Sequence, residues 1–218
     1  MPPVVVARGF YARDPRSVAP DLLGKLLIHD DPSGVRRSGR IVEVEAYCGA
    51  ADPASHAYRG ETPRNHTMFG PPGHLYVYFT YGMHWCANVV TGEVGEGLAV
   101  LLRALAPVDG LAAMAAARPR ARRPRDLCNG PGKLCQALGL DREFDGADLV
   151  TANRGIWLAD DGTPPPESPF QTTRIGLSAG AEHPWRWCVP GDPHVSGPAR
   201  LRGVAPTPAP TRAPASGP

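Results

Sequence analysis

Two glutamates on one short segment are the side chains with the clearest potential for chemistry. Residues 39–47 read GRIVEVEAY, a pattern typical of a strand. Because side chains alternate along a strand, we expect one face to carry Ile41, Glu43, Glu45 and Tyr47 and the other to carry Val42, Val44 and Ala46. Two carboxylates roughly 7 Å apart on a strand face indicate exposure, basic partners or a chemical role.

An aromatic hairpin follows this strand in the sequence. Residues 76–88 read as two strands that turn at Tyr81 and Gly82, because glycine supplies the backbone freedom of a tight turn. The tip would then carry an aromatic ring where polar residues are usual. A projecting ring of this kind can insert into a stack of nucleic-acid bases.

Length and composition limit the class of protein. The 218 residues suit one domain, and the 26 prolines and 25 glycines predict many irregular connections. A formal charge of +2 neither requires nor excludes nucleic acid. The first eight residues lack the pattern of a secretion signal, and no apolar run approaches the roughly 18 residues of a membrane span. We expect a protein that is not secreted and has no membrane partner.

The five cysteines indicate reduced thiols and a cytoplasmic location, because their number is odd and they are spread along the chain. Cys128 and Cys135 fit no zinc spacing, and the seven histidines form no pair at ligand spacing. The sequence therefore predicts no metal and no cofactor.

The order of elements predicts an α+β fold in a single domain. Strands are expected at 26–28, 39–47, 97–103, 155–158 and 185–189, with helices at 17–25 (Pro20 near its start), 111–117 and 133–138 and a long loop at 48–73. We expect a curved, mostly antiparallel sheet with surrounding short helices and a protruding β-hairpin. The domain should cover residues 1–202, and residues 203–218, with five prolines in 16 positions, should form a disordered tail.

Six short motifs, in this order, resemble a known family. They are DLLGK at 21–25, the strand at 39–47, TPRN at 62–65, the segment 75–83, LLRAL at 101–105 and CNGPGKLCQAL at 128–138. From about Gly9 to Arg202 the chain resembles the alkyladenine (3-methyladenine) DNA glycosylases. The resemblance implies a monofunctional enzyme of base excision repair that flips alkylated or deaminated purines, hypoxanthine included, out of duplex DNA and hydrolyses the N-glycosidic bond. It would act as a monomer on double-stranded DNA that contains damaged purines, at the nucleoid in a prokaryote or in the nucleus of a eukaryote.

The resemblance assigns the catalytic roles. Glu45 matches the general base that activates a water, and Arg103 and the carbonyl of Val189 match groups that hold this water. A carboxylate there could also stabilise the positive charge that develops on the sugar. A purely structural Glu45–Arg103 pair is the alternative.

The same resemblance assigns the pocket for the flipped base. Tyr47 would form one wall, and His56 and Tyr78 the other, so that flat aromatic faces bind a cationic purine. Asn88 would exclude guanine by crowding its exocyclic amine. Taken one at a time, the tyrosines are more typical of a core, His56 of a loop and Asn88 of a strand.

DNA contacts are expected on and beside the hairpin. Tyr81 would enter the minor groove, whereas Tyr76, Met83 and Arg64 would lie near the DNA backbone or support the hairpin. Lys133 follows a Gly-Pro-Gly turn and suits a phosphate, with a plain turn as the alternative. Five arginines within residues 118–125 form either a solvated loop or a phosphate contact. Two departures from the family stand beside the hairpin: His84, where a tyrosine is common, and a longer segment at 91–96.

Two other functions remain open from the sequence. A carbohydrate glycosidase could use Glu43 and Glu45 as its carboxylate pair. A non-catalytic binder of distorted DNA would need the hairpin but not the chemistry. No lysine accompanies Glu45 as an amine nucleophile, so a glycosylase of this kind should form no Schiff base.

Overall fold

The computed structural model describes residues 2–80 and 82–197. Tyr81 and the predicted tail at 203–218 therefore lie outside the described residues. The helices are α1 (Arg8–Tyr11), α2 (Pro15–Leu22), α3 (Leu111–Ala117) and α4 (Pro131–Leu138). The strands are β1 (Val4–Val5), β2 (Leu26–Asp30), β3 (Arg36–Cys48), β4 (His74–Thr80), β5 (His84–Thr91), β6 (Leu98–Asp109), β7 (Ala147–Asp148), β8 (Ile156–Asp160), β9 (Phe170–Thr172) and β10 (Arg186–Cys188).

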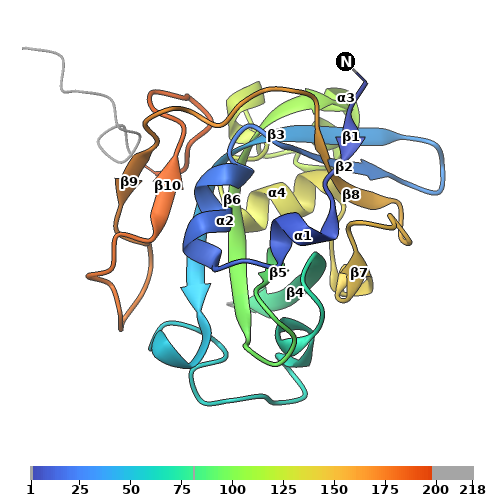
Figure 1. Cartoon of the computed structure of the whole chain (residues 1–218). Helices are drawn as coiled ribbons and strands as arrows, with labels where there is room; N and C mark the ends of the chain where they lie inside the picture. The colour runs from blue at the N-terminus through green and yellow to red at the C-terminus, as the bar shows by residue number, and fades with distance from the viewer. Residues whose placement is uncertain (1, 81, 198–218) are drawn as a thin grey trace, which may run out of the picture.

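One curled antiparallel sheet organises the molecule (Figure 1). Its strand order is β1-β8-β2-β3-β6-β5-β4-β7, and β10 joins β3 and carries β9 on its other edge. The long strand β3 pairs with β6 along one edge, while its other edge pairs first with β2 and then with β10. This arrangement confirms the predicted α+β fold with a curved antiparallel sheet.

The main core lies between one face of the sheet and the helices. Leu22 of α2, Met114 of α3 and Leu134 of α4 share a single buried cluster with the strand residues Val100 and Leu102. Alternation along β6 turns Leu101 and Arg103 to the opposite face. That opposite face carries the polar side chains described below.

Alternation along β3 is interrupted before the glutamates. Ile41 packs in the main core with Val44 and Ala46, whereas Val42 packs in a separate cluster with Cys188. The predicted faces of Ile41 and Val42 are therefore wrong. The register with β6 shifts between Ile41 and Val44, so a bulge reverses the side-chain direction there.

The predicted hairpin is confirmed as β4 and β5. Thr80 pairs with His84, the Met83 N–H donates to the Thr80 carbonyl at 3.2 Å, and Gly82 takes a left-handed φ of 66°. A side chain at Gly82 would be strained in this conformation, which is why glycine suits the turn. The exposed side chain of Met83 follows the turn.

The first long helix differs from its predicted bounds. Helix α2 begins at Pro15 after Asp14, whose side chain accepts from the Arg16 N–H, and Pro20 lies inside it rather than near its start. Proline at the first helical position and an aspartate cap explain the earlier beginning. Within the part of the chain that the structure describes, no helix is long and apolar enough to cross a membrane.

Candidate active site

A cavity of about 400 Å³ opens on the face of the sheet opposite the main core. Alternating residues of β4, β5 and β6 form its floor, and the loops after β3 and β9 form its sides. It is lined by Tyr47, Ala54, His56, Met68, Tyr76, Tyr78, Thr80, Cys86, Asn88, Leu101, Arg103, Pro131, Ile175, Gly176 and Leu177. The predicted pocket residues Tyr47, His56, Tyr78 and Asn88 thus lie around one space.

Glu45 lies directly behind the cavity wall and is fully buried. Its Oε2 accepts from the Tyr47 hydroxyl at 3.0 Å and lies 3.1 Å from Arg103 Nη1, while its Oε1 accepts from the Ile175 N–H at 2.8 Å. All three of these partners also line the cavity. The carboxylate is therefore held at the edge of the cavity by groups that face it.

Glu43 is a structural carboxylate. Its Oε1 accepts from Arg103 Nε at 2.8 Å, Arg186 Nε at 2.7 Å and the Ser196 hydroxyl at 2.8 Å, and its Oε2 accepts from the Ser196 N–H at 2.6 Å. Burial alone would raise the pKa of Glu43, but Arg103 and Arg186 outweigh it and lower the pKa below its usual 4.5. Glu43 therefore stays ionised, and hydrogen bonds from the protein hold both of its oxygens.

Arg103 joins the two glutamates. Its Nε donates to Glu43, its Nη1 lies beside Glu45, and its Nη2 donates to the Ser196 hydroxyl at 3.4 Å. Burial would lower the pKa of Arg103, but Glu45 and Glu43 raise it above its usual value. The guanidinium is thus fixed in orientation and charge while it lines the cavity.

Aromatic rings form one side of the cavity. The rings of His56 and Tyr78 lie 4.4 Å apart edge to face, and Tyr76 stacks on Tyr78 at 5.5 Å. His56 Nδ1 lies 3.0 Å from the Tyr76 hydroxyl. Burial, together with Arg64, lowers the pKa of His56 below 6.5, and burial raises the pKa of Tyr76 to about 12. Neutral rings therefore face the cavity at neutral pH.

Asn88 lies at the floor of the cavity and is nearly buried. Its Nδ2 donates to the Tyr76 carbonyl at 3.1 Å, which fixes the amide.

Val189, the third residue with a predicted catalytic role, is not among the partners that hold Glu45. The Val189 N–H donates to Val42, its carbonyl accepts from the Asp192 N–H at 3.3 Å, and the residue does not line the cavity.

A basic groove lies beside the cavity, between the hairpin and α4. The groove has a volume of about 810 Å³ and shares Thr80, Cys86 and Pro131 with the cavity. Its other lining residues are Met83, His84, Trp85, Arg118, Pro119, Arg120, Gly130, Gly132, Lys133 and Gln136. The sequence could not show that the arginine cluster meets Lys133 here, because the two segments are joined only by tertiary packing.

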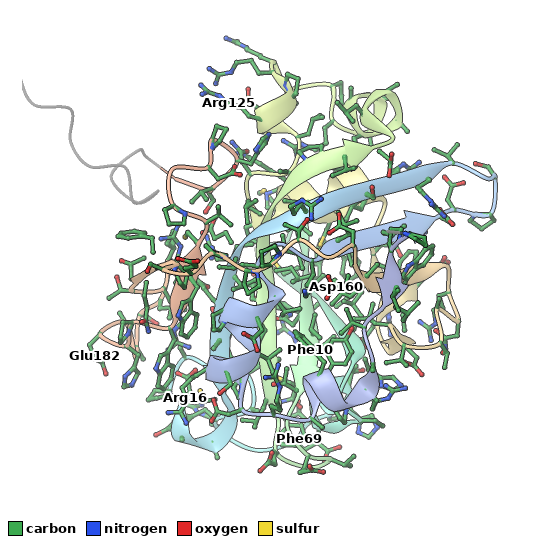
Figure 2. All side chains as sticks on the ribbon, turned by 45° about the horizontal axis from the view of Figure 1, so that its top comes forward. Phe10, Arg16, Phe69, Arg125, Asp160 and Glu182 are labelled. Carbon is green, nitrogen blue, oxygen red and sulfur yellow. The ribbon has the colours of Figure 1, made fainter. Side chains whose placement is uncertain are left out.

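The cations of the basic groove have neutral partners. Lys133 donates to the Asn129 side chain and Arg118 to the Gln136 side chain, each at 2.8 Å. Across residues 2–80 and 82–197, no carboxylate pairs with Arg118, Arg120 or Lys133. Arg123 and Arg125, by contrast, pair with Asp126, and Figure 2 shows Arg125 pointing outward at one end of the molecule.

The remaining predicted DNA contacts divide by exposure. Met83 is exposed at the hairpin, and Arg64 donates to the Phe79 carbonyl at 3.1 Å, which supports the hairpin. Tyr76 is buried beneath His56 on the hairpin strand β4 and lines the cavity. Tyr81 lies outside the described residues.

Sequence reasoning missed the residues that support the site from a distance. Ile175 donates to Glu45, Ser196 and Arg186 hold Glu43, and a buried pair joins Arg174 to Asp52. The one sequence signal for these supporting residues was Arg186, a basic residue between Trp185 and Trp187 in the predicted strand 185–189. Among the residues that the structure describes, no three His, Cys, Asp or Glu side chains come together as metal ligands.

Comparisons with known proteins identify the family of the chain. A family model described as "Methylpurine-DNA glycosylase (MPG)" matches residues 9–193. A protein of Burkholderia lata is 56% identical over 201 residues, which cover 92% of this chain and 95% of that protein. Proteins of Streptomyces avermitilis and Carboxydothermus hydrogenoformans are 47% and 46% identical, each over 88% of this chain and over 90% and 99% of their own lengths. All three are named "Putative 3-methyladenine DNA glycosylase". The chain belongs to the methylpurine-DNA glycosylase family and is a DNA glycosylase, a hydrolase of DNA repair that acts on DNA.

Proposed function

We propose that the protein is a monofunctional glycosylase that receives a flipped, damaged purine in the cavity and hydrolyses its N-glycosidic bond with a water activated by Glu45. The observation that supports this proposal is the set of partners of Glu45. Its three neighbours Tyr47, Arg103 and Ile175 all line the cavity, so a carboxylate is fixed beside the space in which a base would lie.

Cleavage of the glycosidic bond leaves positive charge on the sugar, which an adjacent ionised carboxylate stabilises. Arg103, whose Nη1 lies 3.1 Å from Glu45 Oε2, orients the water, and Glu45 accepts the proton as the water attacks the anomeric carbon. The bonding electrons leave with the purine. Glu43 takes no direct part, because four hydrogen bonds already occupy its two oxygens. This occupancy argues against a carbohydrate glycosidase with two active carboxylates.

The aromatic walls and Asn88 select the base. Tyr47 lies on one side, with His56 and Tyr78 on the other, and electron-rich rings favour alkylated purines that carry positive charge. In the tautomer in which His56 Nδ1 accepts from the Tyr76 hydroxyl, His56 Nε2–H is a donor to a neutral lesion such as hypoxanthine. Asn88 rejects guanine by crowding its exocyclic amine.

The basic groove carries the DNA strand. Its cations lack carboxylate partners and lie beside the cavity mouth, where the phosphates that flank a flipped nucleotide would pass.

The test is product analysis with duplexes that carry one hypoxanthine or one ethenoadenine, together with methylated DNA for 3-methyladenine. We expect free purine, an abasic site that breaks only on alkaline treatment, and no covalent adduct on borohydride reduction. Strand cleavage with a trapped adduct would contradict a water mechanism, and binding without product would indicate a non-catalytic protein.

A further inference from the structure

A buried ion pair outside the cavity holds two of its walls together. Arg174 Nη1 and Nη2 donate to Asp52 Oδ2 and Oδ1 at 2.5 and 2.8 Å, and both side chains are fully buried. Arg174 follows β9, whereas Asp52 follows β3. A planar guanidinium and a carboxylate in this two-point geometry fix both segments in distance and in angle.

Each partner of the pair reaches a different part of the cavity. Asp52 Oδ1 accepts from the N–H of the cavity residue Ala54 at 3.0 Å. Arg174 donates to the carbonyls of Ala46 and Gly180, each at 3.0 Å, and lies 4.8 Å from the centre of the Tyr47 ring. The pair therefore holds both the base-stacking ring and the backbone of the loop between β9 and β10, which lies beside the end of β3 (Figure 1).

The next residue along the chain makes the link to the chemistry. Ile175 donates its N–H to Glu45 Oε1, so Arg174 is the side chain that anchors the peptide unit beside the carboxylate. A glycine in this loop allows the backbone to pack closely against the pair. Gly180 has a φ of +60°, and a Cβ there would lie 3.2 Å from Arg174 Nη2 and Asp52 Oδ1.

We propose that Arg174, held by Asp52, is a positioning residue for hydrolysis: it keeps the Ile175 N–H on Glu45 Oε1. This leaves Oε2 directed to Arg103 and Tyr47, at the edge of the cavity where the water must lie. The inference rests on the proposed role of Glu45. It assigns no contact between Arg174 and the DNA.

The test is Arg174→Lys, which keeps the charge but cannot reproduce the donations to Asp52, Ala46 and Gly180 together. Single-turnover rates with protein in excess do not depend on the folded fraction. We expect a rate lower by about 10- to 100-fold, because small misplacements at a reacting centre have effects of this size. We expect the affinity for lesion DNA to change less than 3-fold, because the substitution affects the chemical step and not binding.

The pH profile distinguishes positioning from a general structural role. An amide donor favours an ionised carboxylate, so its loss should move the acid limb of the rate profile to higher pH. The titratable and charged groups that interact with Glu45 are Tyr47, Tyr78, Cys86, Arg103, Arg174 and Cys188. Lysine preserves the charge at 174 and leaves the other five intact, so a shift reports on the donor.

Arg40→Lys is the control. Arg40 also binds an aspartate at two points, Asp161 at 3.1 and 2.8 Å, and a carbonyl, that of Gly24 at 2.7 Å, but it lines neither the cavity nor the basic groove. We expect it to lower the melting temperature while keeping the parent rate and pH profile. Asp52→Asn is a second variant of the pair and should lower the single-turnover rate as Arg174→Lys does.

The outcomes separate the inference from the proposed function. If Glu45→Gln is inactive while Arg174→Lys and Asp52→Asn keep the parent rate and profile, the positioning role is wrong and the role of Glu45 stands. A lower rate of Arg174→Lys with an unmoved acid limb would also overturn the positioning role. If Glu45→Gln itself releases base at the parent rate, both proposals are overturned.

Discussion

The cavity and the basic groove share three lining residues but treat charge in opposite ways. Around the cavity, each buried carboxylate forms an ion pair with an arginine: Arg103 pairs with Glu43 and Glu45, and Arg174 pairs with Asp52. In the basic groove, Arg118 and Lys133 donate to neutral side chains, and no carboxylate among the described residues forms an ion pair with either. Under the proposed mechanism, charges that act in the reaction are fixed before the substrate arrives, because reorganising them in the transition state would slow the reaction. Under the same proposal, the cations of the basic groove bind the phosphates of the DNA.

The largest expected effect lies in the cavity. Glu45→Gln should lower the rate of base release by about 10²- to 10⁴-fold, the usual contribution of a general base. The amide keeps the shape of the site, so binding to lesion DNA should remain. Single-turnover assays and a binding titration on the same duplex measure the two effects separately, and release at the parent rate would remove Glu45 from the mechanism.

Glu43→Gln should affect stability more than chemistry. Removing one partner of a buried ion network costs about 3–5 kcal/mol of unfolding free energy. The base release of the folded protein should fall far less than in Glu45→Gln. Urea unfolding and base-release assays of the two variants check this contrast. It would be contradicted if Glu43→Gln were at least as stable as Glu45→Gln and less active.

The pH dependence of stability gives a second check on Glu43. Its pKa is lower in the folded protein than the usual 4.5, so its stabilising contribution is complete above that value and disappears as the pH falls through the folded pKa. Glutamine cannot titrate. The stability difference between parent and Glu43→Gln should therefore narrow below about pH 4.5, and a constant difference would show that the carboxylate charge does not matter.

The two neighbouring glutamates also show what the sequence could predict. Their strand, the hairpin and most helices followed from alternation, glycine placement and proline patterns. The division of roles came from the family resemblance. The physical reason for it lies in Ser196 and Arg186, which reach Glu43 from more than 140 positions away in the chain, and no local pattern encodes such contacts.

Local irregularities limited the fold prediction as well. Alternation placed Ile41 on the wrong face because a bulge depends on the register with β6, which the sequence of one strand does not contain. Arg174 lies in an irregular segment with no motif, and Asp52 resembles any loop aspartate. Only the tertiary structure, in which the two loops lie side by side, shows this ion pair.

Within the cavity, Asn88 should control selectivity. Asn88→Ser makes room for the exocyclic amine of guanine, and a clash of this kind is typically worth about 1–3 kcal/mol. We expect the ratio of guanine-derived to adenine-derived bases released from methylated DNA to rise, with adenine-type release nearly unchanged. An unchanged ratio would show that Asn88 does not face the base.

The smallest expected effects lie in the basic groove. Arg120→Gln should reduce the slope of log affinity against log salt by about 0.9, the value for one lost phosphate contact. Arg122→Gln is the matched control, because Arg122 is exposed on the same segment but does not line the groove. Equal slopes for both variants would indicate that the whole arginine segment, and not the groove, attracts DNA.

The most direct test of this separation of roles is the single-turnover rate of base release by the double variant Arg120→Gln/Lys133→Gln, measured as a function of protein concentration. One curve gives both the concentration at half-maximal rate and the plateau. We expect the half-maximal concentration to rise by 10-fold or more, as for two lost phosphate contacts of about 1 kcal/mol each, and the plateau to stay within about 2-fold of the parent. A lower plateau with an unchanged half-maximal concentration would contradict the account, because the groove would then take part in the chemistry and not in binding.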